Sequence, residues 1–223
     1  KLDMALKMVN EVGLENVGVM GDTFHMNIEE SNLTFVFPRD ITVSKFDDGK
    51  FYRKSFGKMP GGKGVDIIAD SGDMLQLIEI KNCKGHEQEN RWRTSVDNSK
   101  VTSAPATLDV KDRDSLDIEV AKKVASTIAC LYGAWTKAAQ SDAARELSEL
   151  WNRACDERIS ISEKTIMVIL FLEGDFDNPR SVTRSKKMIM ERLQDSIRTK
   201  LSWLNCRVSV VDSATYNKRC FEL

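Results

Sequence analysis

Hydrophobic positions recur along the chain with two different periods, which separate helical from extended stretches. Apolar residues lie three or four apart in four stretches, a spacing that is typical of helices buried on one side. These stretches are residues 2–12, 117–140, 142–157 and 181–204. The first is followed by Gly13, a natural helix stop.

The rest of the apolar pattern predicts strands. β-Branched and aromatic residues cluster between residues 34 and 56, and turn-forming residues interrupt them. Three strands are expected there, followed by a hairpin and two later strands. Outside the hairpin, the expected strands are residues 34–37, 41–46, 50–56, 163–172 and 206–212.

The hairpin is the most unusual of these stretches, because charges stand in two almost wholly apolar strands. Residues 64–70 and 74–81 are joined by Ser71-Gly-Asp73. Asp66 lies in the first strand, and Glu79 and Lys81 lie in the second. Residues two apart in a strand point to the same face, so Glu79 and Lys81 project together. Burying such charges is costly unless they pair or hold a metal.

The order of elements predicts the fold class. A helix, a run of strands with the hairpin, a long polar stretch (residues 82–116), two helices, a strand, a helix and a strand follow one another. This order predicts an α/β fold with a mixed central sheet flanked by helices. No composition shift divides the chain, so we expect a single domain over residues 1–223. The first residue is Lys1 rather than Met, which leaves open that the chain is a piece of a longer protein.

Composition narrows the function less than the hairpin does. The formal net charge of −1 does not announce a nucleic-acid partner, although a local basic patch can still bind one. The longest apolar run, residues 165–172, is far shorter than the roughly 20 residues of a membrane span, and no signal-peptide pattern is seen. The five cysteines form no CxxC pair. We therefore expect a cytoplasmic protein in a reducing compartment, with no membrane association.

The three charges of the hairpin match the needs of a magnesium site. Mg²⁺ prefers oxygen ligands and keeps several waters, so Asp66, Glu79 and the backbone carbonyl of Ile80 are candidate ligands. A bound ion activates water for attack on phosphorus, and Lys81 would position that water or stabilise the phosphate. We expect Mn²⁺ to substitute for Mg²⁺. The alternative is a structural ion pair, but two carboxylates and one lysine leave an excess negative charge.

These residues resemble the motif of the PD-(D/E)xK, or restriction-endonuclease-like, nuclease superfamily. The match consists of Gly64-Val-Asp66 and Ile78-Glu-Ile-Lys81, with Val65 in place of the usual proline. The resemblance implies a restriction-endonuclease-like core, metal-dependent cleavage of DNA more readily than RNA, and a role in bacterial antiviral defence or restriction. It further implies a homodimer or an association with a regulatory protein. The alternative is an inactive relative that binds nucleic acid or a protein.

The same resemblance implies an acidic residue from the first helix. Glu11 is the best positional candidate for this catalytic carboxylate, and Glu15 is the next.

Basic residues on both sides of the hairpin are candidate contacts for nucleic acid. Upstream, residues 57–64 nearly spell the P-loop pattern, but Gly64 replaces the required Ser or Thr and a strand follows where a helix is needed. We therefore interpret this stretch as a glycine-rich approach to the hairpin, with Lys58 and Lys63 available to phosphates, or as a simple flexible turn.

Downstream of the hairpin, Lys84, Arg91 and Arg93 surround Trp92. Basic residues beside an aromatic ring can contact phosphates and stack on bases. The alternative is a solvated loop with Trp92 in the core.

Overall fold

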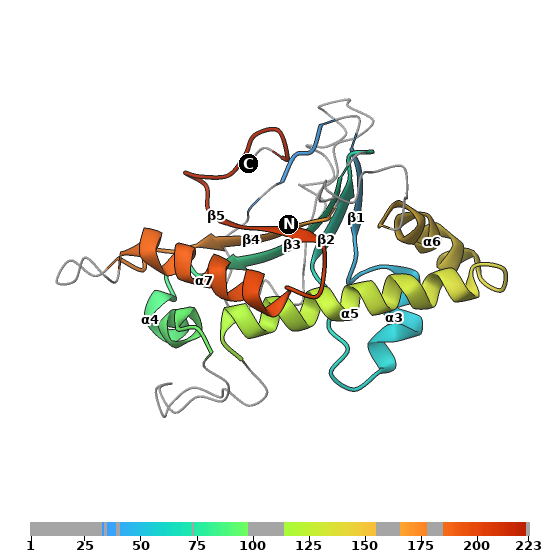
Figure 1. The fold of residues 1–223 in the computed structure, drawn as a ribbon, viewed down its shortest axis with the longest axis horizontal. Coiled ribbons are helices and arrows are strands. Elements are labelled where there is room, and N and C mark those ends of the chain that lie inside the picture. Colours follow the sequence, from blue (N-terminus) through green and yellow to red (C-terminus); the bar gives the residue numbers. More distant parts are fainter. Residues whose placement is uncertain are drawn as a thin grey trace, which may run out of the picture.

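A five-stranded mixed sheet with helices on one face forms the centre of the molecule (Figure 1). The computed structural model describes residues 33, 35–38, 41–72, 74–97, 114–154, 166–177 and 185–221. The predicted helix over residues 2–12 lies outside this part of the chain. The strands are β1 (Thr42–Lys45), β2 (Ile67–Asp70), β3 (Leu75–Asn82), β4 (Ile166–Glu173) and β5 (Cys206–Val211). The helices are α3 (Lys50–Lys54), α4 (Glu87–Asn90), α5 (Leu116–Lys137), α6 (Asp142–Ala154) and α7 (Lys186–Lys200), with short 3₁₀ turns at Phe56–Lys58 and Arg91–Thr94.

The strands lie in the sheet in the same order as in the sequence. β1, β2 and β3 form an antiparallel meander, whereas β4 runs parallel to β3 and β5 runs parallel to β4. Parallel neighbours need a crossover connection. The segment carrying α5 and α6 connects β3 to β4, and the segment carrying α7 connects β4 to β5 (Figure 1). The predicted α/β class, with a mixed sheet flanked by helices, is confirmed.

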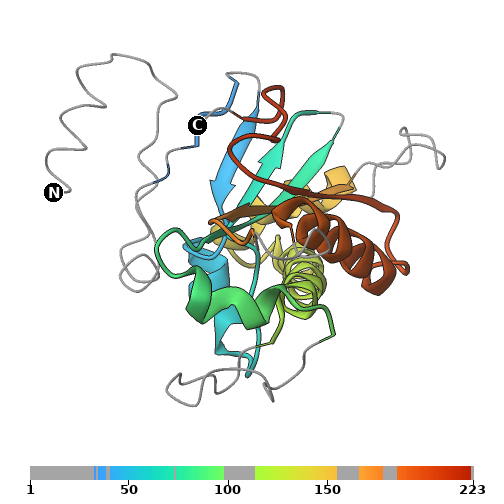
Figure 2. The ribbon, with the colours of Figure 1, turned by 90° about the vertical axis from the view of Figure 1, so that its left-hand side faces the viewer.

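Both faces of the sheet are apolar, which explains the nearly continuous apolar runs in its central strands. On one face, Leu75 and Leu77 of β3 pack in the core cluster that includes residues of α5, α6 and α7. On the other face, Ile78 packs with Phe35 and Phe221, from segments before β1 and after β5. Figure 2 shows α5 and α7 together on one side of the sheet and the C-terminal segment on the other.

Most predicted elements that fall in the described part of the chain are confirmed, with shifted ends. The predicted helices at 117–140, 142–157 and 181–204 correspond to α5, α6 and α7, and the strands at 163–172 and 206–212 correspond to β4 and β5. None of the helices in the described ranges could span a membrane.

The predicted strand over residues 34–37 is reduced to a single bridge residue, Val36, in the part of it that the structure describes. The predicted strand over residues 50–56 is wrong. Residues Lys50–Lys54 form the short helix α3, which begins after Gly49 and buries Phe51. The ring of Tyr52 packs on Phe46, with ring centroids 5.3 Å apart. Aromatic residues that indicated a strand therefore fold back onto the end of β1. Tertiary packing outweighs β propensity in so short a stretch.

A close approach at Gly64 explains the glycine before the hairpin and gives the first prediction. A Cβ atom at Gly64 would lie 2.4 Å from Cε1 of Phe46, a fully buried ring. We expect Gly64→Ala to lower the free energy of unfolding by about 1–3 kcal/mol, as overpacking does in a dense core. Urea denaturation measures the change.

Gly133→Ala is the matched control, because a Cβ atom there meets no atom within 4 Å. Gly133 lies near the C-terminal end of α5, four residues before Lys137, so this substitution should raise stability by at most about 1 kcal/mol. Equal effects of the two substitutions would contradict the packing explanation.

Candidate functional site

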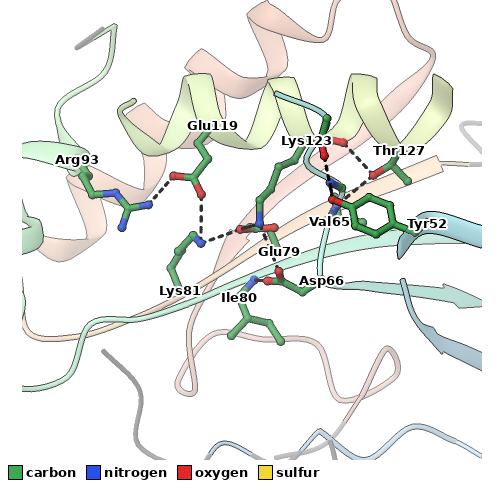
Figure 3. Close-up of polar contacts among 12 residues, drawn as sticks. Tyr52, Val65, Asp66, Glu79, Ile80, Lys81, Arg93, Glu119, Lys123 and Thr127 are labelled. Carbon is green, nitrogen blue, oxygen red and sulfur yellow. Dashed lines mark hydrogen bonds and ion pairs between the residues drawn. The ribbon is translucent and has the colours of Figure 1, made fainter. Parts of the chain in front are cut away.

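Asp66 and Glu79 lie opposite each other on adjacent strands. Asp66 directly precedes β2, and its backbone continues the sheet: its N–H donates to the carbonyl of Ile78 (3.1 Å), and its carbonyl accepts from Phe46 (2.9 Å). The register pairs Ile67 with Ile78, and its continuation by one residue sets Asp66 across from Glu79. Both side chains therefore emerge on the sheet face that α5 covers (Figure 3).

Glu79 is the most deeply buried member of the site, with an exposed fraction of 0%. Its Oε1 atom accepts from two ammonium groups, Lys81 at 2.8 Å and Lys123 at 2.6 Å. Its Oε2 atom is also buried and has no hydrogen-bond partner among the residues described. One oxygen is thus doubly compensated while the other retains acceptor capacity.

Asp66 is held by one backbone bond and one ion pair. Its Oδ2 atom accepts from the N–H of Ile80 at 2.7 Å, and its Oδ1 atom lies 3.3 Å from Nζ of Lys123. The ammonium of Lys123 therefore contacts the two predicted carboxylates at once. The two acids and Lys81, which the sequence predicts as a group, are brought together as expected.

A chain of ion pairs extends from Lys81 to a neighbouring loop. Lys81 lies 3.2 Å from Oε1 of Glu119, whose Oε2 atom accepts from Arg93 at 2.5 Å. Arg93 in turn donates to the side chain of Asn90 at 3.1 Å. The head of Lys81 is thus held from two sides, by Glu79 and by Glu119 (Figure 3).

A row of polar residues on α5 supplies the partners that the sequence analysis missed. Glu119, Lys123 and Thr127 lie four residues apart, so they share one face of the helix. Thr127 donates to the carbonyl of Lys123 (2.8 Å) and accepts from the N–H of Val65 (3.0 Å), next to Asp66. The signal in the sequence is a polar residue at every fourth position, next to the apolar positions Val120 and Val124 of the buried face of the helix.

The glycine-rich stretch before Asp66 is fixed by Tyr52 of α3. The hydroxyl of Tyr52 donates to the carbonyl of Gly62 and accepts from the N–H of Gly64, each at 3.0 Å. The chain then enters β2 rather than a helix, so it lacks the helix N-terminus on which a P-loop depends. Lys58 and Lys63 are exposed on this stretch.

The remaining predicted contacts differ in accessibility. Arg91 and Lys84 are exposed, although Nζ of Lys84 lies 3.3 Å from Glu173. Arg93 is buried, so the structure corrects its expected role as a surface contact: its guanidinium turns inward to Glu119. Trp92 is also buried, in agreement with the alternative interpretation of this loop.

The carboxylate expected from the first helix stays a prediction. The candidates Glu11 and Glu15 lie outside the described residues. In the described part of the chain, the carboxylate that contacts Lys81 from a helix is that of Glu119, which comes from α5.

The two glutamates of the site are perturbed in opposite directions. Burial, reinforced by the charge of Asp66, raises the pKa of Glu79 against the attraction of its lysines. Burial also opposes ionisation of Glu119, but the charges of Lys81 and Arg93 outweigh it and hold the pKa of Glu119 far below its usual range. Glu119 therefore remains an anion while Glu79 takes up a proton more readily.

Both lysines remain cations. Burial alone would lower the pKa of Lys81, yet the carboxylates of Glu119 and Glu79 raise this pKa well above its ordinary value. For Lys123, burial again opposes the charge, and the Glu79 carboxylate is the largest of the influences that leave its pKa raised. The site thus carries fixed positive charges beside a carboxylate pair.

The donor set is compatible with a hard divalent cation at one point. Oδ1 of Asp66 and Oε1 of Glu79 converge on a single ammonium nitrogen, which marks a position where a cation is stabilised. Oε2 of Glu79 has acceptor capacity left. Within the residues described, no cluster of three or more His, Cys, Asp or Glu side chains is found, so water and backbone would complete the shell.

The charge of the whole network is balanced, in contrast to the excess negative charge expected from the hairpin residues. Three carboxylates, Asp66, Glu79 and Glu119, are matched by three cations, the two lysines and Arg93. The excess negative charge expected from the hairpin alone is compensated by residues of α5 and its neighbouring loop. A metal ion would therefore be attracted by the convergence of Asp66 and Glu79 rather than by an excess negative charge.

Glu119 gives the second prediction. Replacing it by Gln leaves Lys81 and Arg93 without their shared anion, and removal of one partner from a buried pair costs about 3 kcal/mol. Because the folded-state pKa of Glu119 is depressed, its contribution is complete above the unfolded value and declines as the pH falls below about 4. The stability gap between wild type and Glu119→Gln should therefore be largest at neutral pH and narrow in acid, as measured by urea denaturation across pH.

Glu149→Gln is the matched control, since Glu149 is an exposed glutamate of α6. It should change stability by less than about 0.5 kcal/mol. A Glu119→Gln protein as stable as wild type at pH 7, or a gap that does not vary with pH, would contradict the assignment.

Comparison with known proteins places the chain in a family but leaves its activity open. No curated protein and no solved structure matches the chain. One family model matches residues 49–223, which include every described strand except β1 and every described member of the charge network. The match covers well over half of the chain. The chain therefore belongs to DUF6661, a family of unknown function.

Proposed function

We propose that this protein is a metal-dependent nuclease with a restriction-endonuclease-like core, which hydrolyses phosphodiester bonds of nucleic acid, DNA more readily than RNA. The observation that carries the proposal is the convergence of Asp66 and Glu79 on one cation, with Lys81 beside them. These are the residues on which the motif resemblance rests.

The topology supports the same proposal. An antiparallel meander, β1 to β3, presents the motif on its second and third strands, and a helical crossover then leads to the parallel strand β4. This is the element order that the resemblance implies for a nuclease core. Asp66 precedes β2, while Glu79 and Lys81 lie near the end of β3.

Each residue has a defined task in the proposed reaction. Asp66 and Glu79, with the carbonyl of Ile80, would hold Mg²⁺ or Mn²⁺. When bound, such an ion activates water and offsets charge on the phosphate. Lys81, fixed by Glu79 and Glu119, directs an ammonium at the scissile phosphate or at the attacking water. Arg93 keeps Glu119 in position through its guanidinium.

The surroundings supply a surface that fits an anionic polymer. Lys58, Lys63 and Arg91 are exposed, and the side chain of Lys84 is 51% exposed. Their location before and after the hairpin supports contacts to the phosphate backbone on both sides of the site. A cytoplasmic location in a bacterial defence or restriction system, with a homodimer or a regulatory partner, is part of the proposal, and the buried free thiols of Cys130 and Cys220 fit a reducing compartment.

A second candidate is a non-catalytic relative that binds nucleic acid or a protein through the same fold. The observation on its side is the charge balance of the network, in which two lysines and Arg93 compensate the three carboxylates. A cleavage assay distinguishes the nuclease from the binding module. Only the nuclease should cut nucleic acid when a divalent ion is present, and its cutting should require Asp66 and Glu79.

The third prediction concerns this assay. Wild-type protein with Mn²⁺ or Mg²⁺ should cut DNA in a panel of plasmid, linear, single-stranded DNA and RNA substrates. Asp66→Asn and Lys81→Met should each lower the rate at least about 100-fold, because the first removes a charged ligand of the metal and the second removes the ammonium at the reacting phosphate. Gel electrophoresis of the products measures the rates.

Asp70→Asn is the matched control for Asp66→Asn. Asp70 ends the same strand, β2, and its Oδ1 atom accepts from the N–H of Gly72, away from the site. This control should cut at the wild-type rate. Wild-type protein that leaves the whole panel intact with either ion would refute the enzyme and favour the binding module, and cleavage that survives Asp66→Asn would refute the assigned site.

A further inference from the structure

We propose that Lys123 is the resident counter-ion of the metal position: in the metal-free protein its ammonium holds Asp66 and Glu79 together, and a divalent ion binds only as this ammonium withdraws. The inference rests on the proposed function, because it takes the metal site from there. It assigns a role to a residue of α5 that lies outside the motif.

The geometry of the two contacts is the first step. Nζ of Lys123 lies 2.6 Å from Oε1 of Glu79 and 3.3 Å from Oδ1 of Asp66 (Figure 3). The two carboxylates face each other across adjacent strands, so their charges repel unless a cation stands between them. Lys123 provides that cation from the helix above the sheet.

The second step is that an ammonium and a metal ion cannot share this point. Mg²⁺ binds oxygens at about 2.0–2.1 Å, and Nζ of Lys123 already lies 2.6 Å from Oε1 of Glu79. An ion bound to Oε1 between the two carboxylates would therefore occupy the space of this ammonium. Oε1 of Glu79 already accepts from two ammonium groups, so a divalent ion there would be a third cation, and its double charge would repel both of them. Occupation by a divalent ion therefore requires that one ammonium leaves Oε1.

The third step identifies which lysine leaves. Lys81 is anchored on its far side by Glu119, at 3.2 Å, and Glu119 is anchored by Arg93. Among the residues described, Lys123 forms its ion pairs with Asp66 and Glu79, the two carboxylates that the metal would take. The lysine side chain is a flexible chain of four methylene groups, so rotation about its bonds can move the ammonium of Lys123 outward while Lys81 stays in place.

Removal of the Lys123 charge should therefore have two opposite effects. Without metal, Asp66 and Glu79 lose their shared counter-ion, so the protein becomes less stable. With metal, the ion no longer competes with an ammonium, so it binds more tightly. A lysine with a purely structural role would show the first effect alone.

The test is calorimetric titration of Mn²⁺ into wild type, Lys123→Met and Lys122→Met, with a thermal melt of each protein without and with Mn²⁺. We expect Lys123→Met to bind Mn²⁺ at least about tenfold more tightly than wild type, to melt at a lower temperature without metal, and to regain stability when Mn²⁺ is added. Adding Asp66→Asn to Lys123→Met should abolish the gain.

Lys122→Met is the matched control, because Lys122 is the adjacent lysine of α5, is 68% exposed and pairs with Asp114. It should bind Mn²⁺ as wild type does. Lys123→Gln, which keeps a polar head without charge, replaces Lys123→Met if the latter does not fold.

The outcomes separate this inference from the proposed function. If wild type binds Mn²⁺ through Asp66 as tightly as the Lys123 variants do, the metal site stands and the counter-ion role of Lys123 is refuted. If neither wild type nor the Lys123 variants bind Mn²⁺, the metal site itself is refuted, and the inference with it.

Discussion

A fully buried carboxylate, that of Glu79, is the constraint on which the arrangement of this molecule depends. An ionised carboxylate removed from water costs several kcal/mol unless cations and hydrogen bonds compensate it. One cation, Lys81, comes from the same strand, two residues away. The other, Lys123, comes from α5 and is brought there only when the crossover helix packs on the sheet. The packing of helix on sheet and the charge of the site are therefore coupled.

The polar row on α5 extends this coupling along the helix. Glu119 fixes Lys81, Lys123 joins Asp66 to Glu79, and Thr127 binds the backbone beside Asp66. Three residues spaced four apart on α5 thus contact the two strands of the hairpin and the residue that precedes Asp66. Within a face that otherwise packs against apolar strands, such a row sets the register of α5 over the site (Figure 3). The proposed chemistry uses this rigidity, because Lys81 must hold its position while Lys123 moves.

The sequence predicted the local part of the site and missed its tertiary part, for a physical reason. Glu79 and Lys81 share a strand, and Asp66 precedes the neighbouring strand of a short hairpin, so period-2 alternation was enough to bring them together. Lys123 and Glu119 lie about forty residues later, on a helix whose rotation over the sheet the periodicity alone does not fix. Arg93 was expected at the surface because its loop is polar, yet its guanidinium compensates Glu119.

Elements of the fold that depend on local sequence patterns were likewise easier to predict than an element that depends on tertiary packing. The long helix α5 and the buried strand β4 were predicted because each carries a strong period or an apolar run. The short helix α3 was not, since the aromatic residues that pack it on Phe46 are equally typical of a strand.

The most direct test of the central claim is a crystal structure of the protein soaked in Mn²⁺, with anomalous data at the manganese edge. The account predicts an anomalous peak bridging Asp66 and Glu79, with the ammonium of Lys123 withdrawn from Glu79 and Lys81 still paired with Glu119. A structure without such a peak, in which Lys123 remains bound to both carboxylates, would contradict it.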